Sequence, residues 1–370
     1  MARRAFLHVG TAKSGTSYLQ DLWWQHRDEL RARGLLLPGR GRRDHFTAAA
    51  LVKGFSTVVD GLGERDREVW DRLVAETRAW PGDVLISNEH FADSPAGAAA
   101  AALAALASAA DEVHLVVTAR DLGRVLPSAW QQRIKMGARM PYRKFLGSVR
   151  REGGDRKFWR YQDVLGILDV WSGAIPDARV HVVVVPGPGA ARDELWVRVS
   201  SVLHVDVTGL ATDARRPNDS LGVVEAELLR RVNDTVPREE RTAAYARRLK
   251  RSFVPGALVG SAPHDSFAVP GHHVAWIEET SAALVRTLRS STYDVVGDPV
   301  DLHPSLAADG RTPDQVAEDE LLAAATVVRG RLGLDPVDSL DAALHGIADH
   351  LLRSSRAHRS GTVQRGMSAQ

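Results

Sequence analysis

Four short and nearly continuous apolar runs divide the first half of the chain. Each is rich in valine, isoleucine, leucine or phenylalanine, and they span residues 5–10, 83–91, 112–120 and 179–187. Runs of this length without polar alternation are typical of parallel strands that are buried on both faces. The pattern therefore predicts a central parallel β-sheet.

Segments with helical periodicity separate and follow these runs. They span residues 16–33, 64–80, 96–110, 125–137 and 161–174. Strands that alternate with helices predict a three-layer α/β fold, in which helices flank both faces of the sheet. Ligands of such folds bind beyond the carboxyl ends of the strands, so functional residues are expected there.

Beyond about residue 190 the pattern becomes mainly helical. Its apolar spacing predicts helices within residues 193–203, 220–236, 238–253 and 272–290. Residues 300–330 are polar and weakly patterned, whereas residues 331–353 contain one more short amphipathic helix.

These patterns predict three regions. An α/β core should occupy residues 1–210, and a mainly helical region packed on that core should occupy residues 211–353. The polar composition of residues 354–370 is typical of a disordered tail.

Composition restricts the class of protein further. The 370 residues carry 48 basic and 46 acidic side chains, so the net charge of +2 selects no partner. Cysteine is absent, which excludes disulfides, thiolate metal sites and a cysteine nucleophile. The longest apolar run, residues 96–110, is mostly alanine and is shorter than the roughly 20 residues that a bilayer requires. Because residues 1–9 leave no room for an apolar signal core, we expect a cytoplasmic protein without a transmembrane segment.

The stretch HVGTAKSGTSYLQ, residues 8–20, has the layout of a phosphate loop: a strand, a glycine-bearing loop and the start of a helix. In such loops the backbone N–H groups and the helix N-terminus bind an anion. Gly10 and Gly15 have the interval of the ATP-binding pattern, but Thr16 stands where that pattern requires lysine. The lysine of this loop is Lys13 instead, which disfavours ATP.

A second pattern suited to an anion follows the third apolar run. In TARDLGRVLPSAWQ, Arg120 stands at the predicted end of a strand, and Ser128 lies eight residues later in the following helix. A guanidinium offers a planar pair of donors to a phosphate, and a hydroxyl offers one more donor. Pro127 is compatible with that helix only in its first turn.

Together the two patterns resemble those of the sulfotransferases that use 3′-phosphoadenosine 5′-phosphosulfate (PAPS). The loop is similar to the 5′-phosphosulfate loop of that family, Lys-[Ser/Thr]-Gly-Thr-[Thr/Ser] before a helix, and Arg120 and Ser128 are similar to its 3′-phosphate pair. The resemblance implies a P-loop-like fold, PAPS as cofactor, adenosine 3′,5′-bisphosphate as product and no metal. The cofactor-binding residues that it implies are Lys13, Ser14, Gly15, Thr16, Ser17, Arg120 and Ser128.

The chain departs from the family pattern in two places. Leu122 stands where a proline is often found, and the Arg-Lys-Gly-x-x-Gly stretch of the cytosolic members is missing. In RRPNDSLG, residues 215–222, Arg215 or Arg216 is an alternative ligand of the 3′-phosphate, whereas Asp219 or Ser220 is suited to cap a helix.

The implied reaction resembles phosphoryl transfer, in which the attacking and leaving oxygens are in line. Lys13 and the backbone donors of residues 14–17 would stabilise the charge on the leaving oxygen. The acceptor hydroxyl must lose a proton, and Glu89, just after the second apolar run, is the first candidate for the general base. It loosely matches a catalytic glutamate of some carbohydrate sulfotransferases. His45, after a basic loop, and His90 are the alternatives.

Residues 133–160 are basic and contain Tyr142, Phe145, Phe158 and Trp159. Such a segment can bind nucleic acid through phosphate contacts and stacking, or it can be a solvated surface. Its position after the helix of the second pattern favours a lid over PAPS and the acceptor. We therefore expect no nucleic-acid partner.

Three further histidines, His264, His272 and His273, lack a spaced third ligand. We interpret them as loop residues and predict no metal site.

The sequence thus predicts an enzyme that moves a sulfuryl group from PAPS to a hydroxyl of a small-molecule, carbohydrate or lipid acceptor, such as a glycolipid or a secondary metabolite. Two alternatives remain: a P-loop kinase that uses ATP and Mg²⁺, and a non-catalytic protein that binds PAPS or nucleic acid. Neither alternative explains both patterns as well as a sulfotransferase does. The acceptor and the oligomeric state are not specified.

Overall fold

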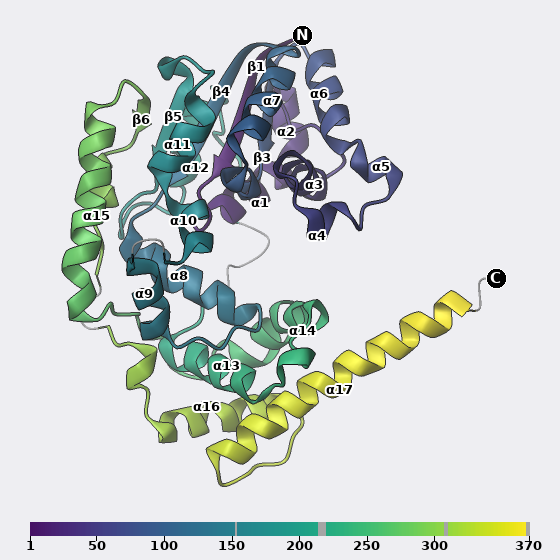
Figure 1. The fold of residues 1–370 in the computed structure, drawn as a ribbon, viewed down its shortest axis with the longest axis vertical. Coiled ribbons are helices and arrows are strands. Elements are labelled where there is room, and N and C mark those ends of the chain that lie inside the picture. The colour runs from purple at the N-terminus through teal and green to yellow at the C-terminus, as the bar shows by residue number, and fades with distance from the viewer. Residues whose placement is uncertain (152–153, 214–219, 307–309, 368–370) are drawn as a thin grey trace. The chain divides into compact units, whose positions relative to one another are not determined.

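The computed structural model describes residues 1–151, 154–213, 220–306 and 310–367, with side chains up to residue 353. In this part of the chain six parallel strands form one sheet (Figure 1). Their order across the sheet is β2(Leu35–Leu36), β3(Asp83–Ser87), β1(Ala2–Gly10), β4(Ala110–Ala119), β5(Val180–Val184) and β6(Asp294–Val296). The predicted α/β fold with a central parallel sheet is confirmed.

Helices cover both faces of this sheet because its strands are apolar on both sides. One face of β1 buries Leu7 and Val9 against a group of helices, and the other buries Phe6 against a second group. The first group is α3(Arg42–Lys53), α6(Val69–Ala79), α7(Ala96–Ala107) and α11(Val164–Ser172), and the second is α1(Thr16–Gln25), α2(Arg27–Ala32) and α12(Glu194–Val202). Each large apolar side chain that is fully buried contributes about 1.5–3 kcal/mol to folding, so packing on both faces stabilises the sheet.

Strand β1 lies between β3 and β4, so the ends of these three strands are neighbours in the sheet. Phe6 in β1 is in register with Leu85 in β3 and His114 in β4. The three strands are parallel, so their carboxyl ends, near residues 10, 87 and 119, meet at one edge of the sheet. In α/β sheets this is the edge at which ligands bind.

The elements that were predicted for the first half occur in the predicted order, and unpredicted elements lie between and after them. Strand β2 and helix α3 were not predicted, and neither was the short edge strand β6. Helix α8(Leu122–Lys135) begins three residues earlier than expected, so Pro127 lies in its interior and not in its first turn. The remaining short elements here are α4(Ser56–Val59), α5(Glu64–Arg67), η1(Glu89–Asp93), α9(Tyr142–Arg150), α10(Arg156–Gln162) and η2(Asp177–Arg179).

The later part of the chain is mainly helical, as predicted. Its elements are α13(Val223–Thr235), η3(Arg238–Glu240), α14(Ala243–Arg248), the π-helix η4(Leu249–Leu258), α15(Gly271–Ser290), η5(Pro299–Leu302), η6(Pro313–Gln315), α16(Glu318–Arg331) and α17(Leu340–Met367). Helix α16 occupies a segment that was expected to be weakly patterned. The backbone of α17 is helical up to Met367, where a disordered tail was predicted.

The chain divides into two compact units whose boundaries differ from the predicted ones. The first unit contains residues 1–125, 155–217 and 276–305, and it holds the whole sheet. The second contains residues 126–154, 218–275 and 306–370. The chain therefore passes between the units several times, whereas one boundary between the core and the helical region, near residue 210, was expected. Within the described residues, none of the helices combines the length and the apolarity needed to cross a membrane.

Candidate active site

The loop between β1 and α1 has a left-handed backbone at Lys13 and at Gly15. Gly15 caps α1 at a φ of 85°, and no side chain supplies a cap hydrogen bond there, so the first amides of the helix are not occupied by a capping side chain. Lys13 has a φ of 68°, which is uncommon for a residue other than glycine and costs on the order of 1 kcal/mol. A Cβ at Gly15 would overlap with Leu195.

The loop is anchored to the end of β4 by hydroxyl and backbone groups. The backbone N–H and the hydroxyl of Thr11 both donate to the carbonyl of Thr118, at 2.8 and 3.0 Å. The Ser14 hydroxyl is fully buried, donates to the Thr11 carbonyl at 2.6 Å and lies 2.5 Å from Thr118 Oγ1. Ser14 was predicted to bind the cofactor, but its hydroxyl already holds the loop in place. If Ser14 contacts an anion, it does so through its backbone N–H.

A second attachment comes from the end of α10. The backbone N–H of Ala12 donates to the Tyr161 carbonyl at 3.3 Å, and Gln162 Nε2 donates to the Ala12 carbonyl at 2.6 Å. Neither Tyr161 nor Gln162 was predicted to belong to the site. With these bonds the loop is held on two sides, and Gly15, Thr16 and Ser17 form the start of α1 between them.

Arg120 stands directly after β4 and is attached to the loop. Its Nη1 donates to the Lys13 carbonyl at 3.0 Å, whereas its Nε is buried and has no hydrogen-bond partner among the described residues. Burial and, to a smaller extent, the nearby Arg124 lower the pKa of Arg120 to about 10. A half-buried guanidinium with an unpaired N–H is stabilised by an anion.

Arg124, in the first turn of α8, lies near Arg120 and was not predicted. Its guanidinium is paired with the buried carboxylate of Asp121, which also accepts from the Arg124 N–H at 3.0 Å. One further nitrogen, Nη2, is buried without a hydrogen-bond partner in the described residues. The end of β4 therefore carries two guanidinium groups and one carboxylate.

Glu89 follows β3 and lies beside the loop. A Cβ at Gly10 would stand 3.5 Å from the Cα and the Cβ of Glu89. Glu89 Oε2 accepts from Gln20 Nε2 at 3.2 Å, and Gln20 also donates to Ser87 Oγ at 3.2 Å. Gln20 of α1 thus orients Glu89, and Glu89 Oε1 has no hydrogen-bond partner among the described residues.

His45 is placed differently from Glu89. Its ring is fully buried, Nε2–H donates to the Pro38 carbonyl at 2.9 Å, and Nδ1 accepts from the Ser87 N–H at 3.2 Å. Burial lowers the pKa of His45 to about 4. Because both ring nitrogens are occupied by backbone groups, this arrangement favours a structural role and disfavours His45 as the general base.

The remaining predicted residues are distributed over both units. Ser128 is half-buried in the part of α8 that belongs to the second unit. Arg215, Arg216 and Asp219 lie outside the described residues. His272 and His273 begin helix α15 and do not lie in a loop as expected.

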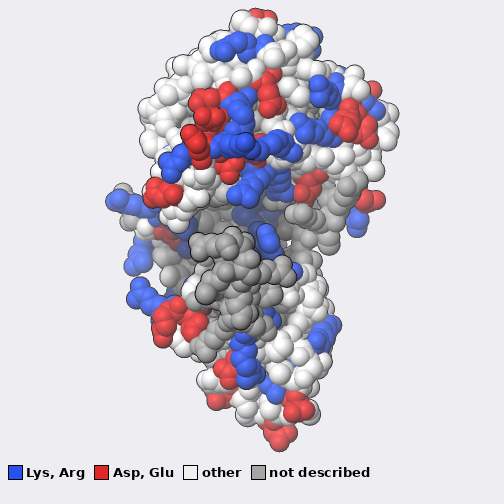
Figure 2. All heavy atoms as spheres, turned by 90° about the vertical axis from the view of Figure 1, so that its right-hand side faces the viewer, with Lys and Arg blue, Asp and Glu red and all other residues white. Residues whose placement is uncertain are grey.

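The basic segment at residues 133–160 uses most of its aromatic residues in packing. Tyr142, Phe145 and Phe158 are buried, and Arg133 stacks on the Phe145 ring at 4.8 Å. Buried rings cannot stack on nucleobases, which disfavours the nucleic-acid interpretation. Among the described residues on the face shown in Figure 2, basic and acidic side chains are interspersed.

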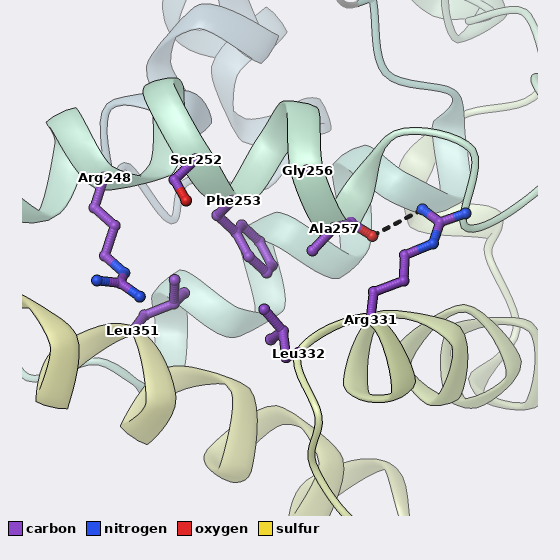
Figure 3. A pocket seen from close by; sticks show the side chains of 8 residues that line it. All are labelled: Arg248, Ser252, Phe253, Gly256, Ala257, Arg331, Leu332 and Leu351. Carbon is purple, nitrogen blue, oxygen red and sulfur yellow. Dashed lines mark hydrogen bonds between the residues drawn. The ribbon is translucent and has the colours of Figure 1, made fainter.

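The second unit contains a pocket of about 180 Å³, which lies between η4, α16 and α17 (Figure 3). Arg248 and Arg331 lie at opposite ends of it, and Phe253 and Leu351 line its apolar part. None of the predicted site residues lines this pocket.

Comparison with known proteins does not assign the chain to a family. No family model, no curated protein and no solved structure matches the chain significantly. Among the described residues, no group of three or more His, Asp and Glu side chains is arranged to hold a metal ion.

Proposed function

We propose that the chain is a sulfotransferase that moves a sulfuryl group from PAPS to an acceptor hydroxyl. The proposal rests chiefly on the 3.0 Å hydrogen bond from Arg120 to the Lys13 carbonyl, because this bond joins the two anion-binding patterns that the sequence contains. A ligand with phosphate groups at both ends of one nucleoside is suited to such a pair.

The loop would hold the 5′ end of the cofactor. Charge develops on the bridging oxygen of the departing adenosine 3′,5′-bisphosphate as the S–O bond breaks. Lys13 and the backbone amides at the start of α1 would stabilise that charge, and the helix dipole favours an anion at the same place. Hydrogen-bond donors stabilise a transition state more strongly when they are already in position before the reaction. The hydrogen bonds of Thr11 and Ala12 hold this loop in position.

Arg120 would hold the 3′-phosphate. Its free Nε is one of the two parallel donors with which a guanidinium binds a phosphate. A phosphate would also compensate the burial that lowers the pKa of Arg120. The resemblance alone assigned Ser128 to the same phosphate, and the proposal made here rests on Arg120.

Glu89 would act as the general base. A carboxylate with one oxygen held by Gln20, and with the other without a partner among the described residues, is arranged to accept a proton from a hydroxyl. The proton moves from the acceptor oxygen to Glu89 while that oxygen bonds to sulfur and the bisphosphate leaves with the S–O electron pair. The product is a sulfate ester.

The assignment of Arg120 can be tested without knowing the acceptor. In calorimetric titrations without metal, Arg120→Ala should weaken the binding of adenosine 3′,5′-bisphosphate by about 10- to 100-fold, the value of a charged hydrogen-bond pair. Binding of adenosine 5′-monophosphate, which lacks the 3′-phosphate, should change little. Arg78→Ala, which removes an exposed arginine that donates to Ser108, is the control. Equal losses for both nucleotides would remove Arg120 from the 3′-phosphate.

A further inference from the structure

A row of polar side chains lies beside Glu89 and is not used by the mechanism above. Lys53, at the end of α3, lies 2.6 Å from the carboxylate of Asp93 and 2.7 Å from the hydroxyl of Tyr161. The Tyr161 hydroxyl lies 3.2 Å from Nδ1 of His90, the residue that follows Glu89. Lys53 and Asp93 are almost completely buried, with 9% and 12% of their side chains exposed.

The chemistry of these groups sets the direction of each hydrogen bond. An ammonium group only donates, so Lys53 donates to both Asp93 and the Tyr161 oxygen. Asp93 is also within 3.5 Å of Arg160, so two cations occupy its oxygens. The Tyr161 hydroxyl has two acceptors nearby, the Asp93 carboxylate and Nδ1 of His90. Asp93 already pairs with two cations, so the Tyr161 proton is assigned to Nδ1, and the single proton of the neutral ring is then on Nε2.

The surroundings of His90 keep that ring neutral. Burial lowers the pKa of His90, and the charged groups around it are Glu89, Asp93, Lys53 and Lys157, two of each sign. Because the charges offset one another, burial decides the direction. His90 therefore presents an N–H donor, and Nε2 has no hydrogen-bond partner among the described residues.

His90 is part of a half-exposed group of aromatic rings. Its ring centroid lies 5.2 Å from Phe46, 6.4 Å from Phe55 and 5.8 Å from Tyr161, and all four rings are only partly buried. Because these rings keep exposed surface, the flat face of a sugar or an aryl group can pack on them, apart from the part of Phe55 over which the Lys53 ammonium lies, 4.9 Å from the ring centroid.

This group is tied to the proposed reaction centre through the backbone. The Tyr161 carbonyl accepts the Ala12 N–H of the anion-binding loop, and Glu89 lies against Gly10 of that loop. The ring group, the proposed base and the loop thus lie at the same edge of the sheet.

We propose that His90 binds the acceptor as a neutral donor: its Nε2–H bonds to an oxygen of a hydroxylated ring that packs on Phe46 and Phe55, and a neighbouring hydroxyl of that ring faces Glu89. This inference rests on the proposed function and adds the class of acceptor, a ring with adjacent oxygens. It assigns His90 to positioning and not to proton removal. Lys53 and Tyr161 act through His90 by fixing its tautomer.

The tautomer can be measured without any substrate. In the full-length protein labelled with ¹⁵N-histidine, NMR at pH 7 should show Nδ1 of His90 without a proton and Nε2 with one. Tyr161→Phe should shift the His90 signals, because Nδ1 loses its donor. Tyr293→Phe, which removes a half-buried hydroxyl that contacts Ser172, should leave them unchanged. A proton on Nδ1 in the wild type would overturn the proposal.

The acceptor role needs kinetics with defined probes. A panel of methyl pyranosides and a panel of simple phenols, each with PAPS, would be scored by the release of adenosine 3′,5′-bisphosphate. His90→Ala should raise KM for the accepted probe about tenfold, with kcat and bisphosphate affinity changed less than threefold. His90→Gln, whose amide N–H replaces the Nε2 donor but cannot remove a proton, should restore KM to within about threefold.

Each other result has a distinct meaning. An equal loss of kcat in His90→Ala and His90→Gln, at unchanged KM, would make His90 the base and overturn the proposal. Binding of the bisphosphate without turnover of any ring acceptor would reject the acceptor class. Failure of the wild type to bind the bisphosphate would instead reject the proposed function, while the NMR experiment would still decide the tautomer.

Discussion

At the scale of single residues, the assignment of Glu89 as the general base depends on one carboxylate oxygen that has no partner among the described residues. Glu89 keeps Oε2 on Gln20 and leaves Oε1 without a partner in the described part of the chain, whereas both nitrogens of His45 are bonded to backbone groups. The difference separates two residues that the sequence alone left as competing candidates.

Glu89→Gln should abolish turnover while leaving the cofactor site intact. The amide has nearly the same shape and can keep the contact with Gln20, but it cannot accept the proton, so the rate should fall by about 10²–10⁴-fold. Calorimetry should show bisphosphate affinity within about twofold of the wild type. Retained turnover would move the base to another residue, and lost affinity would mean that Glu89 supports the loop.

The site residues that the sequence indicated are those with local patterns. Lys13 and Arg120 each belong to a short motif, and the structure brings the two motifs together through the Lys13 carbonyl. Gln20, Tyr161 and Gln162 have no such motif, because they matter only through partners that are distant in the chain. Arg124 could have been noticed, since it follows Arg120 by one helical turn.

At the scale of elements, the loop is shaped by glycine. Gly15 has a left-handed backbone, and any side chain there would meet Leu195 of α12. The start of α1 therefore lies close against α12, and the amides of the loop keep their direction.

Gly15→Ala tests this packing against a matched control. Gly34→Ala introduces a side chain at a similar φ of 92°, but with nothing within 4 Å of the new Cβ. Gly34→Ala should lower the free energy of unfolding by about 1 kcal/mol from backbone strain alone, and Gly15→Ala by more than that, because the overlap with Leu195 adds to it. Urea unfolding measures both. Only Gly15→Ala should lose bisphosphate binding; equal effects of the two variants would contradict the packing argument.

Strands were predictable where they are long and buried on both faces, as β1, β3, β4 and β5 are. Strand β6 has three residues and is not fully buried, so it has little apolar signal. Helix α16 buries Leu321, Ala324, Ala325 and Val328, which have helical spacing, but alanines contribute little to an apolar pattern. The early start of α8 was missed because Pro127 was expected to mark a first turn.

At the scale of the whole molecule, the division into two units could not be predicted from the sequence. Residues 126–154 leave the first unit and residues 276–305 return to it, and no change of composition marks these crossings. The first unit holds the loop, Arg120 and Glu89, so the central chemistry proposed here belongs to one compact body.

Two buried histidines make the stability of this first unit depend on pH. His8 and His45 are fully buried, and burial lowers the pKa of each to about 4. The unfolded chain protonates them near pH 6.5, so between about pH 4 and 6.5 the unfolded state binds more protons, and stability falls as the pH decreases through this window. Each histidine should cost about 1 kcal/mol by pH 5.5.

Urea unfolding at pH 7.5 and 5.5, followed by tryptophan fluorescence, measures this loss. The variant His45→Gln should lose about 1 kcal/mol less than the wild type between the two pH values, whatever its stability at pH 7.5. An identical pH dependence in both proteins would show that His45 is not held neutral in the folded state.

The identity of the bound nucleotide is the central question, and one calorimetric comparison at fixed salt decides it. The purified protein would be titrated without metal with adenosine 3′,5′-bisphosphate, and in parallel with ATP plus Mg²⁺. Tight metal-free binding of the bisphosphate and none of ATP is the predicted result, because Lys13 and Arg120 would engage its two phosphates. Binding of ATP alone would contradict the proposal and favour a kinase.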